Sequence, residues 1–202
     1  MNRSVTITAA GITGIVLAGG KAARMGGLDK GLQSFRGRTL IEWVLARLAP
    51  QVDEVLVSAN RNLESYERLG CRVVQDSSDD FPGPLAGMQA GFRAASHPWL
   101  LTVPCDAPFL PRDLASRLRE DLEASAALCA VASTGGRRQP VFSLASRKLA
   151  SQLDDYLAAG GRAVHGWQSS VHAIEVAFDD GAGFAPLNTP DALSSHEAAD
   201  AG

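Results

Sequence analysis

A glycine-rich, basic segment near the start of the chain has the composition of a phosphate-binding loop. It runs from Leu17 to Lys30 and contains four glycines and three cationic side chains. Glycine allows main-chain amides to come close to an anion. Arg24 offers a planar fork to phosphate oxygens, and Lys21 or Lys30 a point charge. The segment matches neither the Walker loop nor the GxGxxG dinucleotide fingerprint, so we predict a phosphate loop of another kind, with an exposed glycine-rich turn as the alternative.

Acidic residues follow two other apolar segments, where they could hold a metal ion. Asp106 ends an apolar run that begins at Leu100. A carboxylate in this position suits Mg²⁺, which takes oxygen ligands and would stabilise the charge on a leaving pyrophosphate. Asp76 is the second candidate, although a lone aspartate after a strand is often a helix cap or a turn residue. Gly83 and Pro84 predict a tight turn into a helix, where small residues would let a flat ring approach the backbone; a plain turn is the alternative.

The order of the predicted elements determines whether these residues can meet. Strands are predicted at 14–18, 54–58, 72–75, 99–103, 126–132, 139–144 and 173–178. Helices are predicted after the Thr39/Glu42 capping box, over 85–95, 111–123 and 146–158, and from Thr189 onward. Alternating strands and helices are typical of a mostly parallel sheet with helices on both faces. We therefore predict an α/β fold, a single Rossmann-like three-layer domain over residues 1–202.

Ligands of such sheets bind beyond the carboxyl ends of the strands. Four segments directly follow predicted strands, and they are Ala18–Gly20, Ser58–Asn60, Asp76 and Asp106. We therefore expect the four to lie at one edge of the sheet, with the glycine-rich loop and Asp106 on the same ligand.

Composition narrows the classes of protein that fit. The chain has 202 residues, a net charge of -3 and 46% hydrophobic residues, which are ordinary values for a soluble globular protein. The slight acidity argues against a dedicated nucleic-acid surface. No stretch reaches 18 continuous apolar residues, so no membrane span is expected. Three cysteines without CxxC spacing predict neither disulfides nor a zinc site, which indicates a reducing, cytoplasmic location.

As a set, these residues resemble the molybdenum cofactor guanylyltransferases. The matching segments, in the order of that family, are 17–20, 24–26, 29–31, 60–61, 76, 83–87, 104–106 and 187–190. They extend over nearly the whole chain. The resemblance implies an enzyme that transfers GMP from Mg·GTP to the molybdopterin-bound molybdenum cofactor and releases pyrophosphate. It also suggests transient contacts with other cofactor-synthesis proteins or with acceptor molybdoenzymes.

The resemblance also implies roles for individual residues. The catalytic group would be Asp106, which would bind Mg²⁺, with Lys30 and Arg24. The residues it assigns to nucleotide or cofactor binding are Leu17, Ala18, Gly19, Gly20, Lys30, Ser58, Asn60, Asp76, Gly83, Pro84, Asp106 and Asn188. Residues 13–110 would form the GTP-binding half and residues 111–197 the half that receives the pterin. A glycine-flanked run, Arg137-Arg-Gln139, is interpreted as a surface turn, with a contact to the cofactor's phosphate as the alternative.

Two other functions remain open on the sequence. One is a related nucleotidyltransferase, either a cytidylyltransferase for the same pterin or a sugar-phosphate enzyme. The Leu-Ala-Gly-Gly start of the loop favours guanine, since the related cytidylyltransferases carry Leu-Ala-Ala-Gly. The other is a non-catalytic module that binds GTP or the cofactor. Such a module would not need a metal-binding aspartate, so Asp106 argues against it.

Overall fold

The computed structural model describes residues 11–19, 29–76 and 83–187. These residues form a seven-stranded sheet with the strand order β5-β4-β1-β6-β8-β7-β9. The strands are β1 Ile12–Leu17, β4 Glu54–Ser58, β5 Arg72–Val74, β6 Trp99–Pro104, β7 Cys129–Thr134, β8 Arg137–Ser146 and β9 Ile174–Ala177. Strands β5, β4, β1 and β6 pair in parallel, as do β7 and β9. In the described part of this seven-stranded sheet, β8 alone runs against its neighbours β6 and β7, so the predicted mostly parallel sheet is confirmed.

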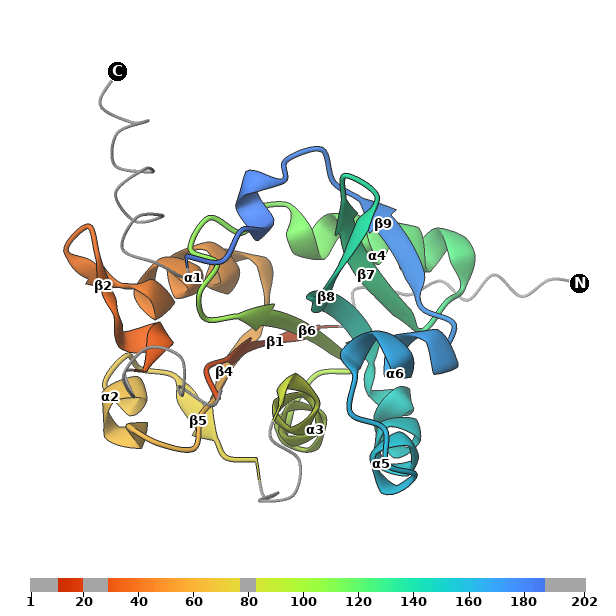
Figure 1. The fold of residues 1–202 in the computed structure, drawn as a ribbon, viewed down its shortest axis with the longest axis horizontal. Coiled ribbons are helices and arrows are strands. Elements are labelled where there is room, and N and C mark those ends of the chain that lie inside the picture. The colour runs from red at the N-terminus through yellow and green to blue at the C-terminus, as the bar shows by residue number, and fades with distance from the viewer. Residues whose placement is uncertain (1–10, 20–28, 77–82, 188–202) are drawn as a thin grey trace, which may run out of the picture.

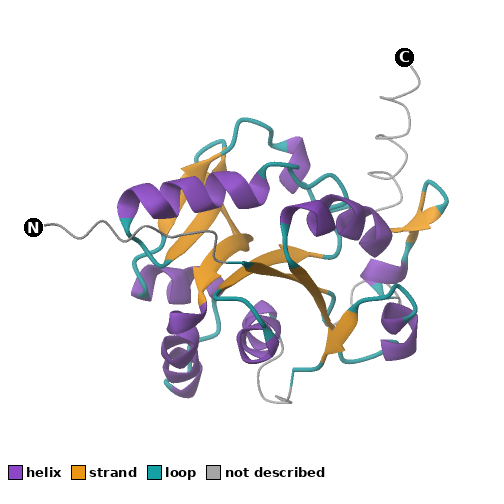
Figure 2. Ribbon diagram, turned by 180° about the vertical axis from the view of Figure 1, so that it is seen from behind, coloured by secondary structure: helices purple, strands orange, loops and turns teal. Residues whose placement is uncertain are grey.

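Helices cover both faces of this sheet (Figures 1 and 2). Helices α1 (Leu40–Leu48) and α4 (Leu114–Ser125) lie on one face, and α3 (Pro84–Ala94), α5 (Ala150–Ala158) and α6 (Val164–Ser170) lie on the other. Strand residues alternate between the two layers, because successive side chains of a strand point to opposite faces. In β1, for example, Val16 packs with α1 and α4, whereas Ile15 and Leu17 pack with α3. The predicted three-layer α/β domain is therefore confirmed.

Helix α3 lies unusually close to the sheet because two of its residues have no side chain. A Cβ added at Gly87 would come within 2.8 Å of Ser58 Oγ and 2.9 Å of Leu17 Cδ2. One added at Gly91 would meet Ile15 Cδ1 at 2.8 Å. Glycine lowers the intrinsic stability of a helix. Gly87 and Gly91 are four residues apart and therefore share one helix face. This face packs directly on β1 and β4, which is possible only because neither residue has a side chain.

Several short elements carry no long apolar pattern and were not predicted. They are the hairpin of β2 (Ser34–Phe35) and β3 (Arg38–Thr39), and helix α2 (Leu63–Glu67). Helix α6 was not predicted either; it follows the predicted 146–158 helix as a separate element. The capping box that was predicted at the start of α1 is present. The Thr39 side chain accepts from the backbone amide of Glu42, and the Glu42 carboxylate accepts from the backbone amide of Thr39. The helix predicted from Thr189 lies outside the described residues.

The prediction of a loop over Arg137–Gln139 is wrong. Those residues begin strand β8, and the turn consists of Gly135 and Gly136 alone. Both glycines have positive φ, 55° and 71°, the backbone that a two-residue hairpin turn requires. Arg138 Nε lies 2.6 Å from Glu175 Oε1 of β9. From the sequence, Gly135 and Gly136 are expected to flank a longer loop, but these two residues are enough to make the whole turn.

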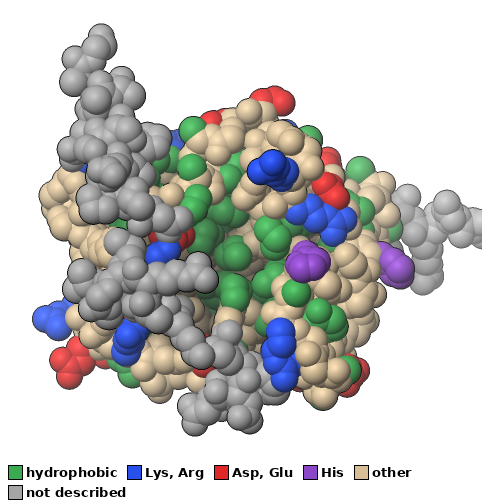
Figure 3. Space-filling view, viewed as in Figure 1, with side chains coloured by type: hydrophobic (Ala, Val, Ile, Leu, Met, Phe, Trp, Pro, Cys, Tyr) green, Lys and Arg blue, Asp and Glu red, His purple; other side chains and the backbone are tan. Residues whose placement is uncertain are grey.

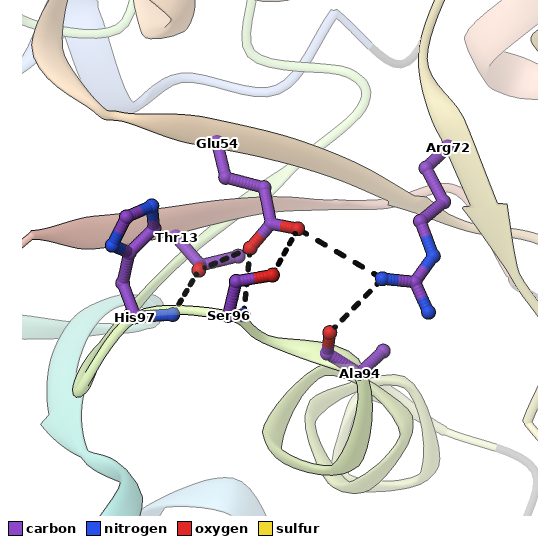
Figure 4. Close-up of polar contacts among 6 residues, drawn as sticks. All are labelled: Thr13, Glu54, Arg72, Ala94, Ser96 and His97. Carbon is purple, nitrogen blue, oxygen red and sulfur yellow. Dashed lines mark hydrogen bonds and ion pairs between the residues drawn. The ribbon is translucent and has the colours of Figure 1, made fainter.

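A polar cluster ties together the amino ends of three strands (Figure 4). Glu54 Oε2 accepts hydrogen bonds from Thr13 Oγ1 at 2.6 Å and from the Ser96 amide at 2.8 Å. Ser96 Oγ donates to Glu54 Oε1 at 2.9 Å, and Arg72 Nη1 lies 3.9 Å from the same oxygen. The His97 amide donates to Thr13 Oγ1 at 3.3 Å. The cluster lies at the end of the sheet opposite to the candidate site described below.

No helix in the described ranges is long and apolar enough to cross a membrane. The three cysteines, Cys71, Cys105 and Cys129, are free thiols, in agreement with the prediction that they form no disulfides.

Candidate active site

Hydrogen bonds join the carboxyl ends of four neighbouring strands. The amide of Cys105, after β6, donates to the carbonyl of Leu17 at 3.2 Å. The amide of Ala18, after β1, donates to the carbonyl of Ser58 at 2.9 Å, and that of Ala59 to Val74 at 3.0 Å. The ends of β6, β1, β4 and β5 therefore form one continuous edge. The segments predicted to meet there do meet, as far as the described residues extend.

This edge borders a cavity of about 240 Å³. Its walls come from the end of β1, from the segment that starts at Asp29, and from the residues after β4 and β6, with Pro84 of α3 and Val141 of β8 closing it. The lining residues are Leu17, Ala18, Gly19, Asp29, Lys30, Arg61, Pro84, Pro104, Cys105, Asp106 and Val141. In the space-filling view, apolar side chains gather in a hollow on the same face as β1, β6 and β8 (Figure 3). The described ends of the glycine-rich segment and Asp106 thus border one cavity, as expected from the sequence.

Lys30 and Asp106 form an ion pair at the wall of the cavity. Lys30 Nζ lies 3.1 Å from Asp106 Oδ2, and the side chains are 39% and 15% exposed. Lys30 begins a short 3-10 helix, Lys30–Leu32, and Asp106 follows β6. Two residues assigned to catalysis are therefore in direct contact. The third, Arg24, lies outside the described residues.

Asp29 also belongs to the cavity wall, although no separate role was predicted for it. Its side chain caps the helix Lys30–Leu32 by accepting the Gly31 amide at 3.2 Å. It accepts two further hydrogen bonds, from Tyr66 Oη at 2.5 Å and from Asn62 Nδ2 at 3.1 Å. Burial and the hydrogen bond to Asp29 raise the pKa of Tyr66 well above its usual range, so its hydroxyl stays protonated and remains a donor. A motif search could flag Asp29 only as a neighbour of Lys30, because its partners come from α2, which was not predicted.

Asp76 and Asn60 bind each other beside the first turn. Asn60 Nδ2 donates to Asp76 Oδ1 at 2.6 Å, and the Asp76 amide donates to Asn60 Oδ1 at 3.1 Å. A Cβ placed on Gly19 would lie 3.7 Å from Asp76 Oδ2. Both predicted residues therefore lie next to the glycine-rich segment, on the side away from Asp106. Asp76 uses one carboxylate oxygen in this pair, and its role in ligand binding stays a prediction.

Gly83, Pro84 and Ser58 are three further residues that were predicted to bind the nucleotide, and the structure defines the surroundings of each. Gly83 is the N-cap of α3 and Pro84 its first residue, so the predicted turn into a helix is confirmed. A Cβ on Gly83 would meet nothing within 4 Å, which leaves space for a flat ring. Ser58 is only 1% exposed, and its hydroxyl points toward Gly87. The Ala18 amide is bonded to the Ser58 carbonyl, and Gly19, the next residue, lines the cavity.

Two other residues complete the surroundings of Asp106. Cys105 is buried, and burial together with the neighbouring Asp106 raises the pKa of its thiol, which disfavours the thiolate form. The amide of Leu187 donates to the carbonyl of Asp106 at 2.8 Å. This contact brings the segment just before Asn188 to the metal-ligand candidate. Asn188 and Gly20 themselves, like Arg24, lie outside the described residues.

The residues present fit a magnesium ion. The described residues contain no group of three His, Cys, Asp or Glu side chains that could hold a metal by themselves. Asp106 would therefore supply a single carboxylate, whose side chain borders the cavity. Mg²⁺ is commonly held by one or two carboxylates together with substrate phosphates and water. A hard oxygen donor at the wall of a cavity that also carries the cations Lys30 and Arg61 agrees with that mode of binding.

The chain is similar to proteins of known family along almost its whole length. Residues 14–172 match the family described as MobA-like NTP transferase domain. A molybdenum cofactor guanylyltransferase from Cupriavidus taiwanensis is 48% identical over 192 residues, which cover 93% of this chain and 96% of the relative. One from Cupriavidus metallidurans is 49% identical and covers 92% and 94%.

Solved structures support the fold at lower identity. Molybdopterin-guanine dinucleotide biosynthesis protein A from Archaeoglobus fulgidus superposes with a TM-score of 0.75 at 22% identity, covering 94% of this chain and 98% of that one. The 4-diphosphocytidyl-2C-methyl-D-erythritol synthase of Anaerococcus prevotii superposes with a TM-score of 0.77 at 15% identity and covers 100% of both chains. At these identities the likeness concerns the fold alone.

Proposed function

Since this chain belongs to the molybdenum cofactor guanylyltransferase family, we propose that it transfers GMP from GTP to the molybdopterin-bound molybdenum cofactor in the cytoplasm. The observation that carries the proposal is the contact between Lys30 and Asp106 inside the cavity that begins at Leu17. It provides a cation for a phosphate and a carboxylate for a metal ion within one ligand's reach.

The reaction is an in-line displacement at the α-phosphorus of GTP. A terminal phosphate oxygen of the cofactor forms the new P–O bond. The bond from the α-phosphorus to the oxygen that bridges to the β-phosphate breaks, and pyrophosphate leaves with the electron pair. An ionised phosphate needs no strong general base, and the cavity lining described above includes no histidine. Positioning and charge neutralisation therefore provide most of the catalysis.

Each wall of the cavity has a part in this proposal. The Gly19 amide and the Lys30 ammonium group would bind phosphate oxygens, with Arg61 as a further cation on the same wall. The turn at Gly83, together with Asp76 and Asn60, would accept guanosine. Asp106 would hold Mg²⁺, which when bound offsets charge on the triphosphate and on the departing pyrophosphate.

The pterin would enter from the second half of the chain. Residues 13–110 contribute all but one of the lining residues named above, and Val141 of β8 contributes the other. We assign residues 111–197 to the cofactor side because β8 extends the sheet directly beside β6. Arg137 and Arg138 begin β8, which runs antiparallel to β6 and therefore starts beyond the carboxyl end of that strand. Because Arg138 is already paired with Glu175, we do not assign this pair of arginines to the pterin.

Two measurements test the proposal against its rivals. Pyrophosphate release is measured with the molybdopterin cofactor, Mg²⁺ and each of GTP, CTP, ATP and UTP. Of the four nucleotides, we expect only GTP to give pyrophosphate release. Release with CTP would instead identify a cytidylyltransferase. If none of the nucleotides gave release, the proposal would be contradicted. Calorimetry with the same four nucleotides then separates a binding module, which would bind GTP without turnover, from a chain that does not bind it.

A further inference from the structure

Tyr66 is a buried residue of α2 whose hydroxyl reaches the wall of the cavity. Its side chain is 0% exposed and its ring packs in the core with Val57 and Val103. Its hydroxyl donates to Asp29 Oδ1 at 2.5 Å. The residues that line the cavity do not include Tyr66, so it can affect a bound ligand only through a neighbour.

Asp29 is that neighbour, and it fixes the main chain that follows. The oxygen that accepts from Tyr66 also accepts the Gly31 amide at 3.2 Å, and the other oxygen accepts from Asn62. The packing here leaves no slack, because a Cβ on Gly31 would lie 2.8 Å from Tyr66 Oη. One hydroxyl and one carboxylate thus hold the turn that starts the helix Lys30–Leu32.

The turn carries the cation of the site. Lys30 Nζ lies 3.1 Å from Asp106 Oδ2, and a lysine side chain is a flexible stem that carries a point charge. Its placement therefore depends on where its main chain begins. A small displacement of a group that orients a reacting phosphate has a large kinetic cost.

We propose that Tyr66 is a positioning residue for the transfer reaction, which through Asp29 holds Lys30 in register with Asp106 and with the substrate's phosphates. This inference rests on the proposed function and deepens it by adding a residue from outside the cavity. The contact between Tyr66 and Asp29 is a hydrogen bond to a carboxylate. Such a bond contributes more free energy than one between two neutral groups.

The test compares the two tyrosines of the chain, which offer a matched pair. Tyr66→Phe removes the hydroxyl that binds Asp29. Tyr156→Phe removes a hydroxyl that donates to the carbonyl of Ala163 at 3.1 Å, on the α5 side of the molecule. We expect Tyr66→Phe to lower kcat/KM for GTP about tenfold and Tyr156→Phe to change it less than twofold. Equal effects of the two substitutions on kcat/KM would overturn the proposal.

A double-substitution cycle separates positioning from general destabilisation. Asp29→Ala removes the residue through which Tyr66 is proposed to act. In that background Tyr66→Phe should cost less than a further twofold, since its path to Lys30 is already broken. A full, additive loss in the double variant would show that Tyr66 acts by another route. Thermal unfolding of each variant identifies any that does not fold, and the cycle is then read with Asp29→Asn in place of Asp29→Ala, because that substitution removes the charge that the Tyr66 hydroxyl binds.

GTP affinity from calorimetry gives a readout that does not depend on turnover. The same pattern of losses is expected there, because Lys30 would bind the phosphates before any chemistry occurs. If the unchanged chain binds GTP but releases no pyrophosphate, the proposed reaction fails while the affinities still test Tyr66. If turnover is present and affinity and kcat/KM are both unaltered in Tyr66→Phe, the reaction stands and the positioning role fails.

Discussion

Lys30 Nζ lies 3.1 Å from Asp106 Oδ2, although 76 residues separate them in the chain. The contact joins the end of the glycine-rich segment to the end of β6. It forms because β1 and β6 are adjacent parallel strands whose carboxyl ends lie level, with Leu17 opposite Pro104. The two charges thus come from segments that the sheet itself aligns.

The first prediction concerns the carboxylate of this pair. Asp106→Asn keeps the shape of the side chain and removes its charge, so the fold should persist. We expect Mg²⁺-dependent pyrophosphate release to fall by about 100-fold or more, since the charge that would hold the ion is lost. The measurement is kcat/KM at several Mg²⁺ concentrations.

Asp113→Asn is the control for that substitution. Asp113 lies at the start of α4, is 58% exposed and pairs weakly with Arg117 at 4.0 Å. It should leave turnover within twofold of the unchanged chain. Normal turnover in Asp106→Asn would remove Asp106 from the mechanism.

A second prediction tests the close approach of α3 to the sheet. Gly87→Ala adds a methyl group that would lie 2.8 Å from Ser58 Oγ and 2.9 Å from Leu17 Cδ2. Overpacking of this kind costs about 1–3 kcal/mol, which outweighs the roughly 1 kcal/mol that alanine gains over glycine in a helix. Urea unfolding should show a lower free energy of unfolding, and an increase would mean that the helix can move away without cost.

The sequence predicted the long elements because their patterns are regular. β1 is buried along its whole length because helices cover both faces of the sheet. The helical spacing of Ile41, Val44 and Leu48 follows from one side of α1 facing a core. The capping box at Thr39 depends only on local geometry, and it formed as predicted. Convergence at one edge followed from the parallel topology rather than from any single residue.

What the sequence could not give depended on contacts between distant or short segments. Helix α2 has five residues, too few for a periodic pattern, yet it supplies Tyr66 to Asp29. The amide of Leu187 reaches Asp106 from the end of the described chain, and no local motif encodes that pairing. The close approach of α3 to the sheet could not be predicted either, since only the packed structure shows what would occupy the space of a Cβ at its glycines.

A third prediction distinguishes a packing glycine from a ligand-side glycine. Gly83 has an extended backbone, and a Cβ there would meet nothing within 4 Å. Gly83→Ala should therefore leave the free energy of unfolding nearly unchanged, in contrast to Gly87→Ala. If guanosine stacks at this turn, the added methyl should raise KM for GTP by about threefold to tenfold at little change in kcat, as expected for weaker uniform binding. Unchanged KM would place the base elsewhere.

The last prediction concerns the pH dependence of stability through Glu54. Burial raises the pKa of this carboxyl, but hydrogen bonds from Thr13 and Ser96 outweigh burial and hold the pKa below its ordinary value of 4.5. A carboxyl whose pKa is lower in the folded state stabilises the fold above its unfolded pKa, and this contribution is lost as the pH falls through the folded value. Glu54→Gln should therefore lower the free energy of unfolding at pH 7 by about 1–3 kcal/mol. The gap to the unchanged chain should narrow as the pH falls below about 4.5. Chemical unfolding of both chains between pH 7 and pH 3 measures it, with Glu123→Gln, an exposed residue of α4, as the control. If the difference in free energy of unfolding stays constant over this range, the charge of Glu54 contributes nothing to the stability of the polar cluster at the amino ends of the strands.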